Sequence, residues 1–262
     1  MVRNFIKITL LFLATCVNFI VYGEEITFDY GELKYRTVGT TAVVVGPANH
    51  RNKDNLVRVN VPAGVVYGGY AYSVVAIDDY AFQDFINIAD ISIASNVTSI
   101  REGAFAWCTG LKKLNLDETK IETIGKRAFI GCQNIAEISL PKTLKYIGEE
   151  AFMLCYSLIS LSIPSSVRTI EGKAFYSCTL LTTVVLNPKE LSLGAMALRG
   201  CPNISEVTIY SAGYDMPGND NPTQDQYVFD TQVHNNAMLC LCFNVTGSAS
   251  PFKSGSEWRL FV

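Results

Sequence analysis

The dipeptide Ala-Phe returns along this 262-residue chain at an almost constant interval. Its copies begin at Ala81, Ala104, Ala128, Ala151 and Ala174, and a sixth copy is changed to Ala197-Leu198. The successive intervals are therefore 23, 24, 23, 23 and 23 residues. A fixed period of this size indicates a stack of structural repeats, in which each unit packs only on its neighbours. We therefore expect a solenoid.

The residue four positions after each Ala is also nearly constant. It is Phe85 in the first copy and cysteine in the others, namely Cys108, Cys132, Cys155, Cys178 and Cys201. Equivalent side chains of stacked units form columns. We predict that the phenylalanines fill the interior, that the alanines leave room where neighbouring backbones approach, and that residues 151–155 belong to the inside of the molecule.

Each repeat also contains two apolar residues separated by one residue. These pairs are Ile91/Ile93, Leu114/Leu116, Ile138/Leu140, Leu161/Ile163, Val184/Leu186 and Val207/Ile209. Apolar residues at alternate positions are typical of a strand with one buried face, so we expect one short strand from each unit. Pro141 and Pro164 follow two of these strands and end them. The single 24-residue unit has room for its extra residue in a turn at residues 117–120.

The repeat unit resembles that of the BspA-like leucine-rich repeat family, whose unit reads Ala-Phe-x-x-Cys-x-x-Leu-x-x-Leu-x-Leu-Pro-x-x-Val-x-x-Ile. One copy matches this pattern at Cys132, Ile135, Ile138, Leu140, Pro141, Leu144 and Ile147. The resemblance is strong over residues 72–210 and looser at 67–74 and 250–261, which look like the lead-in and closing segments of such proteins from Bacteroidetes-type bacteria. The resemblance implies that this chain is a secreted or surface protein that binds host matrix proteins or other cells.

The predicted fold is an α/β-type repeat solenoid, a leucine-rich repeat array of six units with a parallel β-sheet on one face. Residues 24–71 do not follow the period, and we predict that they form a β-rich N-terminal cap. Its expected strands are residues 33–36, 41–45 and 56–61, and its expected turns are Gly46-Pro47 and Gly68-Gly69. The repeats occupy 72–210, and 211–262 form a loop and a C-terminal cap. The polar loop at 211–236 is long enough to suggest a partner contact.

The first 23 residues have the features of a secretory signal peptide. Arg3 and Lys7 precede an apolar run at residues 8–20, and Gly23 precedes two glutamates. Because the apolar run is shorter than the ~20 residues of a membrane span, we favour cleavage after Gly23 over a retained anchor. A lipid-modified Cys16 is a further alternative, but Thr15 stands where the lipobox pattern has Gly, Ala or Ser. We expect a secreted or cell-surface protein with no transmembrane span in the mature chain.

Charge and motif content argue against several classes of function. The formal net charge is −3, and no run of Lys or Arg provides a surface for nucleic acid. The 23-residue spacing of the cysteines matches no zinc pattern. His50 and His234 stand in polar stretches outside any recognisable nucleophile motif. We therefore expect no catalytic residues, no metal and no cofactor.

The cysteine column allows two chemical states, and export favours oxidation. In-register stacking, however, keeps the Cβ atoms of neighbouring units ~5 Å apart, whereas a disulfide needs ~3.8 Å. Five stacked cysteines also leave one without a partner. We therefore favour buried free thiols over disulfides. Cys240 and Cys242 lie outside the column, and we expect them to pack in the C-terminal cap.

The outward positions of the predicted strands form the candidate partner-binding face. One column contains Asp90, Lys113, Glu137, Ser160, Thr183 and Glu206, and the adjacent column contains Ser92, Asn115, Ser139, Ser162, Val185 and Thr208. Solenoids often use such extended surfaces to bind a protein or a glycan. The alternative is a solvated sheet face that only avoids contacts between like charges.

The sequence therefore predicts an exported, monomeric, non-enzymatic repeat protein that mediates protein or cell-surface binding. The resemblance implies an extracellular-matrix or cell-surface protein as the partner, and the extended strand face also suits a glycan. An alternative is a structural module of the cell envelope that binds a protein of the same cell. A third alternative, an enzyme with a site in the N-terminal cap, has no motif to support it.

Overall fold

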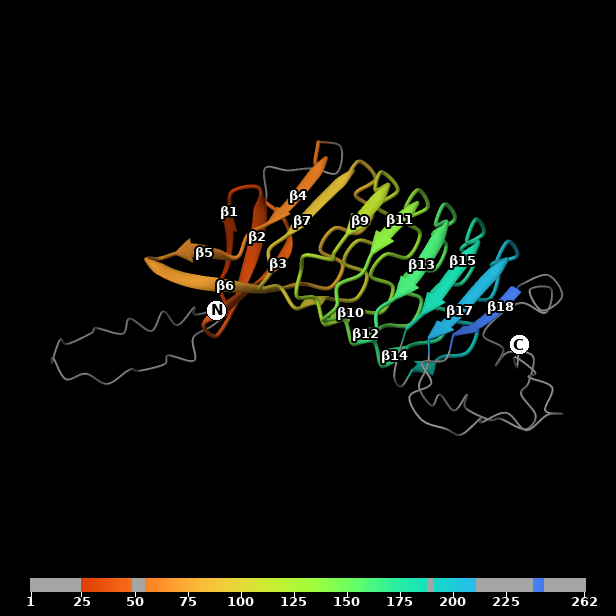
Figure 1. Cartoon of the computed structure of the whole chain (residues 1–262). Helices are drawn as coiled ribbons and strands as arrows, with labels where there is room; N and C mark the ends of the chain where they lie inside the picture. The colour runs from red at the N-terminus through yellow and green to blue at the C-terminus, as the bar shows by residue number, and fades with distance from the viewer. Residues whose placement is uncertain (1–24, 49–54, 188–190, 211–237, 243–262) are drawn as a thin grey trace, which may run out of the picture.

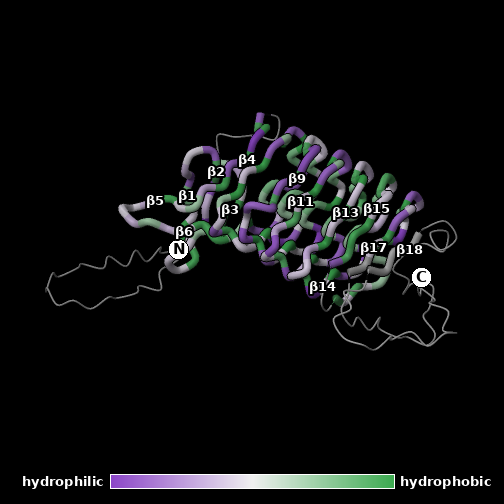
Figure 2. The backbone as a smooth tube through the Cα atoms, in the orientation of Figure 1, coloured by the Kyte–Doolittle hydropathy of each residue, from purple (hydrophilic) through white to green (hydrophobic). Residues whose placement is uncertain are grey.

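The computed structural model describes residues 25–48, 55–187, 191–210 and 238–242. These residues wind into a parallel β-solenoid, and the described part of the chain contains strands and turns but no helix. Hydrophobic and hydrophilic residues alternate along the coils (Figure 2). The prediction of a repeat solenoid is confirmed, with turns in place of helices between the strands.

The N-terminal segment forms antiparallel hairpins that precede the coils (Figure 1). Strands β1 (Thr27–Tyr30), β2 (Leu33–Val38) and β3 (Thr41–Pro47) pair in succession, and β5 (Gly64–Tyr67) pairs with the first half of β6 (Tyr70–Ile77). The β5–β6 hairpin extends away from the coils, and the ring of Tyr67 stacks on Phe28 with centroids 4.3 Å apart. The strands predicted at 33–36 and 41–45 and the turn at Gly68-Gly69 are confirmed.

Gly46-Pro47 is not a turn, as predicted, but the end of β3. A bulge at Lys34/Tyr35 shifts the register opposite it, and Gly46 has a φ of +150°. A Cβ built on Gly46 would lie 3.0 Å from the carbonyl oxygen of Ala81. Gly46 therefore allows the close approach of the first repeat. From the sequence alone, a glycine with this role cannot be distinguished from a glycine in a turn.

One strand from each coil lies along one side of the solenoid (Figure 1). These strands are β4 (Arg58–Val61), β7 (Asp90–Ile93), β9 (Lys113–Asn115), β11 (Glu137–Ser139), β13 (Ser160–Ile163), β15 (Thr183–Leu186), β17 (Glu206–Tyr210) and β18 (Met238–Cys242). Their ladders form three parallel sheets, β4–β7, β9–β11 and β13–β15–β17–β18, where the sequence predicted one. The strand predicted at 56–61 is shorter than expected, since β4 begins at Arg58 and leaves Val57 exposed.

Five of the repeats contribute a second strand, which the sequence did not predict. These strands are β8 (Ser99–Ile100), β10 (Thr123–Ile124), β12 (Tyr146–Ile147), β14 (Thr169–Ile170) and β16 (Ser192–Leu193). They pair in parallel and continue the N-terminal hairpins through β6 into a ten-stranded sheet. The inward residue of β8, β10, β12 and β14 is a buried isoleucine, so this ladder forms the second wall of the core.

The Ala-Phe segments connect adjacent coils by a third set of backbone hydrogen bonds. The N–H groups of Arg127, Phe129 and Gly131 donate to the carbonyl oxygens of Glu149, Ala151 and Met153, at 2.8–2.9 Å. Two positions of this segment have left-handed backbones in every coil, as at Arg127 (φ +55°) and Gly131 (φ +70°). Left-handed residues allow tight reversals, so the segment turns sharply while it still bonds to the next coil.

Phenylalanine forms the interior column that the sequence predicted. The rings of Phe82, Phe105, Phe129, Phe152 and Phe175 are all buried. Successive rings are parallel to within 9°, with centroids 5.2–5.4 Å apart. The adjacent Ala side chains of these coils are buried too. Residues 151–155 are not wholly inside, however, because Met153 and Leu154 are partly exposed.

The five column cysteines are buried free thiols, as favoured from the sequence. Each Sγ lies 3.1–3.5 Å from the phenylalanine carbonyl oxygen of the preceding coil, as Cys132 does from Phe105. The carbonyl oxygen of Phe105 also accepts the backbone N–H of Cys108 in its own coil. The thiol therefore supplies a second donor to a buried carbonyl. Burial raises the pKa of Cys132, Cys155 and Cys178.

Truncation of a ring in the interior column tests its contribution to stability. We expect Phe152→Ala or Phe129→Ala to lower the free energy of unfolding by ~3–5 kcal/mol, because each leaves a cavity between two stacked rings. Chemical denaturation measures the change. Tyr70→Ala is a matched control, since Tyr70 is 72% exposed, and it should stay within about 0.5 kcal/mol of wild type. Equal stability of the Phe152 variant and the control would contradict the stacked column.

Thiol reactivity tests the state of the cysteine column. All five sulfurs are buried, and burial raises the pKa of Cys132, Cys155 and Cys178, which keeps those three thiols protonated, whereas the thiolate is the reactive form. We expect iodoacetamide at about pH 8 to leave Cys108, Cys132, Cys155, Cys178 and Cys201 unmodified in the folded protein and to modify all five in guanidinium chloride. Peptide mapping by mass spectrometry reads each site. Failure of all five to react in unreduced, unfolded protein would show disulfides instead.

Candidate binding surface: the strand face

The predicted outward positions form two neighbouring columns on the strands of one side of the solenoid. The ladder register places Lys113 beside Glu137 and Asn115 beside Ser139. Further along, Ser160 lies beside Thr183 and Ser162 beside Val185. We call this surface the strand face. Eight of its predicted members are exposed, namely Asp90, Ser92, Lys113, Asn115, Glu137, Ser160, Ser162 and Glu206.

Four predicted members of the strand face are less accessible than expected. Ser139, Thr183 and Val185 are half-buried. Thr208 is in register with Val185 but is only 7% exposed, so it offers no accessible side chain to the strand face. The ladder does not end at the strand of Thr208, because β18 pairs with β17 and places Cys240 beside Thr208.

The structure adds residues to the strand face that the sequence analysis missed. Arg58 pairs with Asp90 and Asn60 with Ser92, and both Arg58 and Asn60 are exposed. Val59 and Val61 of the same strand are buried, as in the later repeats. The alternating pattern of this strand was visible in the sequence. Its repeat-type pairing was not, because β4 and β7 are offset by 32 residues instead of 23.

Charge is divided unevenly along the strand face. In its first half, Arg58 Nε lies 3.8 Å from Asp90 Oδ2, and Lys113 Nζ lies 2.6 Å from Glu137 Oε2. Such exposed ion pairs contribute little to stability, but they leave this half without net charge. The following strands β13 and β15 carry no charged residue. A partner therefore meets paired charges on the first strands, an uncharged surface on β13 and β15, and the single charge of Glu206 on β17.

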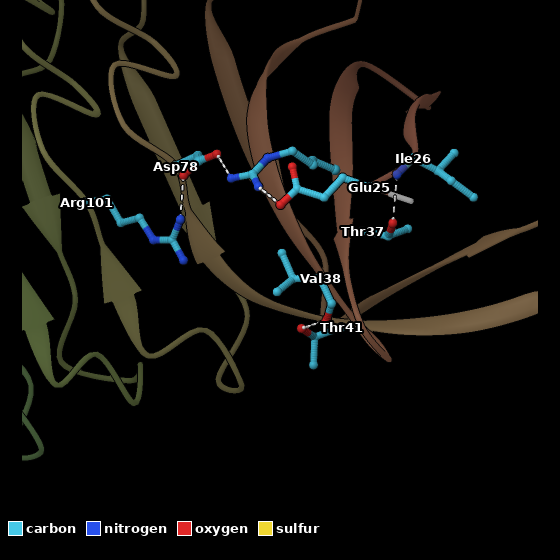
Figure 3. A network of polar contacts seen from close by, with 8 residues as sticks. Glu25, Ile26, Thr37, Val38, Thr41, Asp78 and Arg101 are labelled. Atoms are coloured by element: carbon cyan, nitrogen blue, oxygen red, sulfur yellow. Dashed lines mark hydrogen bonds and ion pairs between the residues drawn. The ribbon is translucent and has the colours of Figure 1, made fainter. Parts of the chain in front are cut away.

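A separate polar cluster joins the N-terminal hairpins to the coils (Figure 3). The carboxylate of Asp78 accepts hydrogen bonds from Arg36 on β2 and from Arg101, each at 2.5 Å. Arg36 also donates to Glu25 at 2.9 Å. Burial would raise the pKa of Asp78, but the hydrogen bonds and charges of the two arginines outweigh it and lower that pKa. Each strong charge has a partner, so the cluster is suited to hold two elements together.

Two kinds of feature, a metal-type cluster and a membrane-type helix, do not occur in the described residues. They contain no group of three or more His, Cys, Asp or Glu residues placed to hold a metal ion. Within the same residues no helix has the length and hydropathy of a membrane span. The predicted signal peptide at 1–23, with Cys16, lies outside the described residues. So do His50, His234 and the loop at 211–236.

The repeats of this chain are about 23 residues long. Each combines a short strand, a buried apolar ladder and an Ala-Phe return segment, and this arrangement is that of a leucine-rich repeat solenoid. The family described as "BspA type Leucine rich repeat region (6 copies)" matches residues 27–130 and 117–217. The chain belongs to this family. The match begins well before residue 72, in agreement with the repeat-type strand β4.

Solved structures share the fold. A leucine-rich cell surface protein from Faecalibacterium prausnitzii A2-165 is 23% identical, with a TM-score of 0.56 over 71% of this chain and 55% of the other. The chain thus spans about half the length of that protein. The Treponema protein described as T. pallidum leucine-rich repeat protein is also 23% identical, with a TM-score of 0.52 over 69% of this chain and 83% of the other. A search of curated proteins found no match.

Removal of the Asp78 charge tests the junction between the hairpins and the coils. We expect Asp78→Asn to lower the free energy of unfolding at pH 7 by about 1.5–3 kcal/mol, because two hydrogen bonds to a charged acceptor are weakened. Chemical denaturation measures the change. Asp90→Asn is the control, because its carboxylate is exposed and 3.8 Å from Arg58, and it should change stability by less than about 0.5 kcal/mol.

The pH dependence of the same comparison gives a second test. A lowered folded-state pKa means that the stability from Asp78 is present above the unfolded pKa of about 3.9 and is lost as the pH falls through the lower folded value. The difference between wild type and Asp78→Asn should therefore persist at pH 5 and shrink only in strong acid. A difference that is absent at neutral pH would contradict the role of this carboxylate.

Proposed function

We propose that this chain is an exported, non-enzymatic repeat protein that binds an extracellular-matrix or cell-surface protein through its strand face. The observation that carries the proposal is the row of outward side chains on parallel strands, supported by a fully buried column beneath it. A rigid, extended surface loses little conformational freedom on binding, which is what a repeat scaffold offers a large partner.

The uneven charge of the strand face supports a protein partner. Its first strands present paired charges, β13 and β15 present small hydroxyl side chains and Val185, and β17 presents Glu206. Protein interfaces combine an uncharged centre with a polar rim, and this face has both. Nucleic acid would need an excess of positive charge, and the chain has a formal net charge of −3.

The first residues and a protein of similar fold support the proposed export. The segment 1–23 has the composition of a secretory signal, with cleavage proposed after Gly23. One protein of similar fold is described as a cell surface protein. The runner-up is a structural module of the cell envelope whose partner belongs to the same cell. Such a module would use the same strand face, but its partner would be a protein of its own cell and not of a host.

Added negative charge on the strand face tests the proposal. The triple variant Lys113→Glu, Ser160→Glu, Ser162→Glu changes three exposed positions, and we expect at least tenfold weaker binding to immobilised fibronectin, laminin or collagen, or to cultured host cells. Surface plasmon resonance and cell-binding assays measure it. The control is Thr98→Glu, Ser165→Glu, Arg168→Glu, which makes the same charge change at exposed positions outside the strand face.

The outcomes separate the alternatives. Loss of binding in the strand-face variant alone, with unchanged thermal stability, supports the proposal. Binding by wild type to envelope fragments of the producing cell, but to no matrix protein or host cell, supports the structural module instead. Equal binding by both variants would show that the strand face is not the contact surface.

A further inference from the structure

A group of apolar side chains, three exposed and three half-buried, lies where the Ala-Phe segments turn into the strand face. Its members are Ile130, Met153, Leu154, Tyr156, Ile159 and Leu180, which we call the apolar corner. Tyr156 is 37% exposed, and Ile159 and Leu180 are each 52% exposed. These three are a quarter of the exposed large hydrophobic residues in the described part of the chain, and they come from two adjacent coils.

Backbone hydrogen bonds hold the members of the apolar corner on neighbouring coils. The N–H of Gly131 donates to Met153 at 2.8 Å, which brings Ile130 next to the fourth coil. The N–H of Leu180 donates to Tyr156 at 3.1 Å. The corner is therefore one surface on three successive coils, and its side chains are carried by a rigid backbone.

The fold does not require apolar residues at the exposed positions of the corner. At the position of Leu180, the other coils have Asn87, Gly110, Asn134, Ser157 and Asn203. At the position of Ile159 they have Ala89, Lys112, Ala136, Thr182 and Ser205. Those coils stack with the same ladders. The stacking of the coils thus does not depend on Ile159 or Leu180, and an exposed apolar cluster of this kind typically marks an interaction site.

The surroundings of the corner determine what it can bind. Its six side chains carry no charge, and two cations of the neighbouring coils are already paired, Arg127 with Glu150 at 2.6 Å and Lys113 with Glu137. An anionic membrane or a sulfated glycan would need unpaired positive charge. A neutral sugar would need polar groups between aromatic faces, and five of the six side chains are aliphatic or thioether. An uncharged protein segment matches the corner in charge and in polarity.

We propose that the apolar corner docks an uncharged protein segment rich in aliphatic and aromatic side chains, and that it provides the central contact of the partner interface. This inference rests on the proposed function, because Ile159 directly precedes Ser160 and the corner thus borders the uncharged half of the strand face. The desolvated apolar centre of an interface supplies most of its affinity, and a polar surround excludes water from it. The apolar corner supplies the apolar centre, and the strand face supplies polar surroundings.

A peptide selection tests the corner without knowledge of the natural partner. A phage-displayed library of random peptides is selected on the immobilised full-length protein, and the selected peptides are then measured by biolayer interferometry. The test variant is Tyr156→Thr, Ile159→Thr, Leu180→Asn, which installs the residues that stand at the same positions of the next coil. The control is Val38→Thr, Val57→Thr, Val66→Thr, which removes three equally exposed apolar residues elsewhere.

We expect the selected peptides to be uncharged and apolar, and to bind the test variant at least tenfold more weakly than wild type or the control. Thermal unfolding should be the same for all three proteins. Absence of enrichment, enrichment of charged peptides, or equal binding to the test variant would overturn the inference. The strand-face variants report on the proposed function separately, since matrix binding that depends on Lys113, Ser160 and Ser162 and not on the corner residues would reject the corner alone.

Discussion

The contact between equivalent residues of adjacent coils is the interaction on which this structure depends. Each phenylalanine ring stacks on the same ring of the next coil at 5.2–5.4 Å, and the backbone on either side bonds to the same neighbour. Like residues can stack in this way only if every coil has nearly the same length. The constant interval in the sequence is therefore a direct consequence of the packing.

The same constraint divides the residues of each coil into two groups. Those that face the column are restricted to Ala, Phe, Cys, Ile, Leu and Val, because each must fit between two copies of itself. Those that face outward touch mainly solvent and their counterparts in neighbouring coils, so they are free to differ. A protein of this kind can change what it binds without changing its core. In this chain, for example, the position held by Leu180 is occupied by Asn87, Gly110, Asn134, Ser157 and Asn203 in the other coils.

The interior could be predicted from the sequence because its signal is repeated six times. The phenylalanine column, the free cysteines and the outward columns all follow from the period. The second ladder could not be predicted, since strands of two residues such as Ser99–Ile100 are too short to show alternation. The pairing of β4 with β7 was hidden by the insertion between them. Leu154 was expected inside because it stands beside buried Cys155, but it has a left-handed backbone (φ +64°) and is partly exposed at the corner.

The central claim is that the interior specifies the fold and that binding belongs to the strand face and the apolar corner. Hydroxyl-radical footprinting of the protein, alone and bound to a matrix or cell-surface protein that it retains, tests this claim most directly, because Met, Tyr, Leu and Ile side chains are modified according to their exposure. The account predicts that Met153, Tyr156, Ile159 and Leu180 become protected on binding, while exposed Tyr70 on the β5–β6 hairpin reacts as before. Protection of Tyr70 with no change at the corner would contradict it.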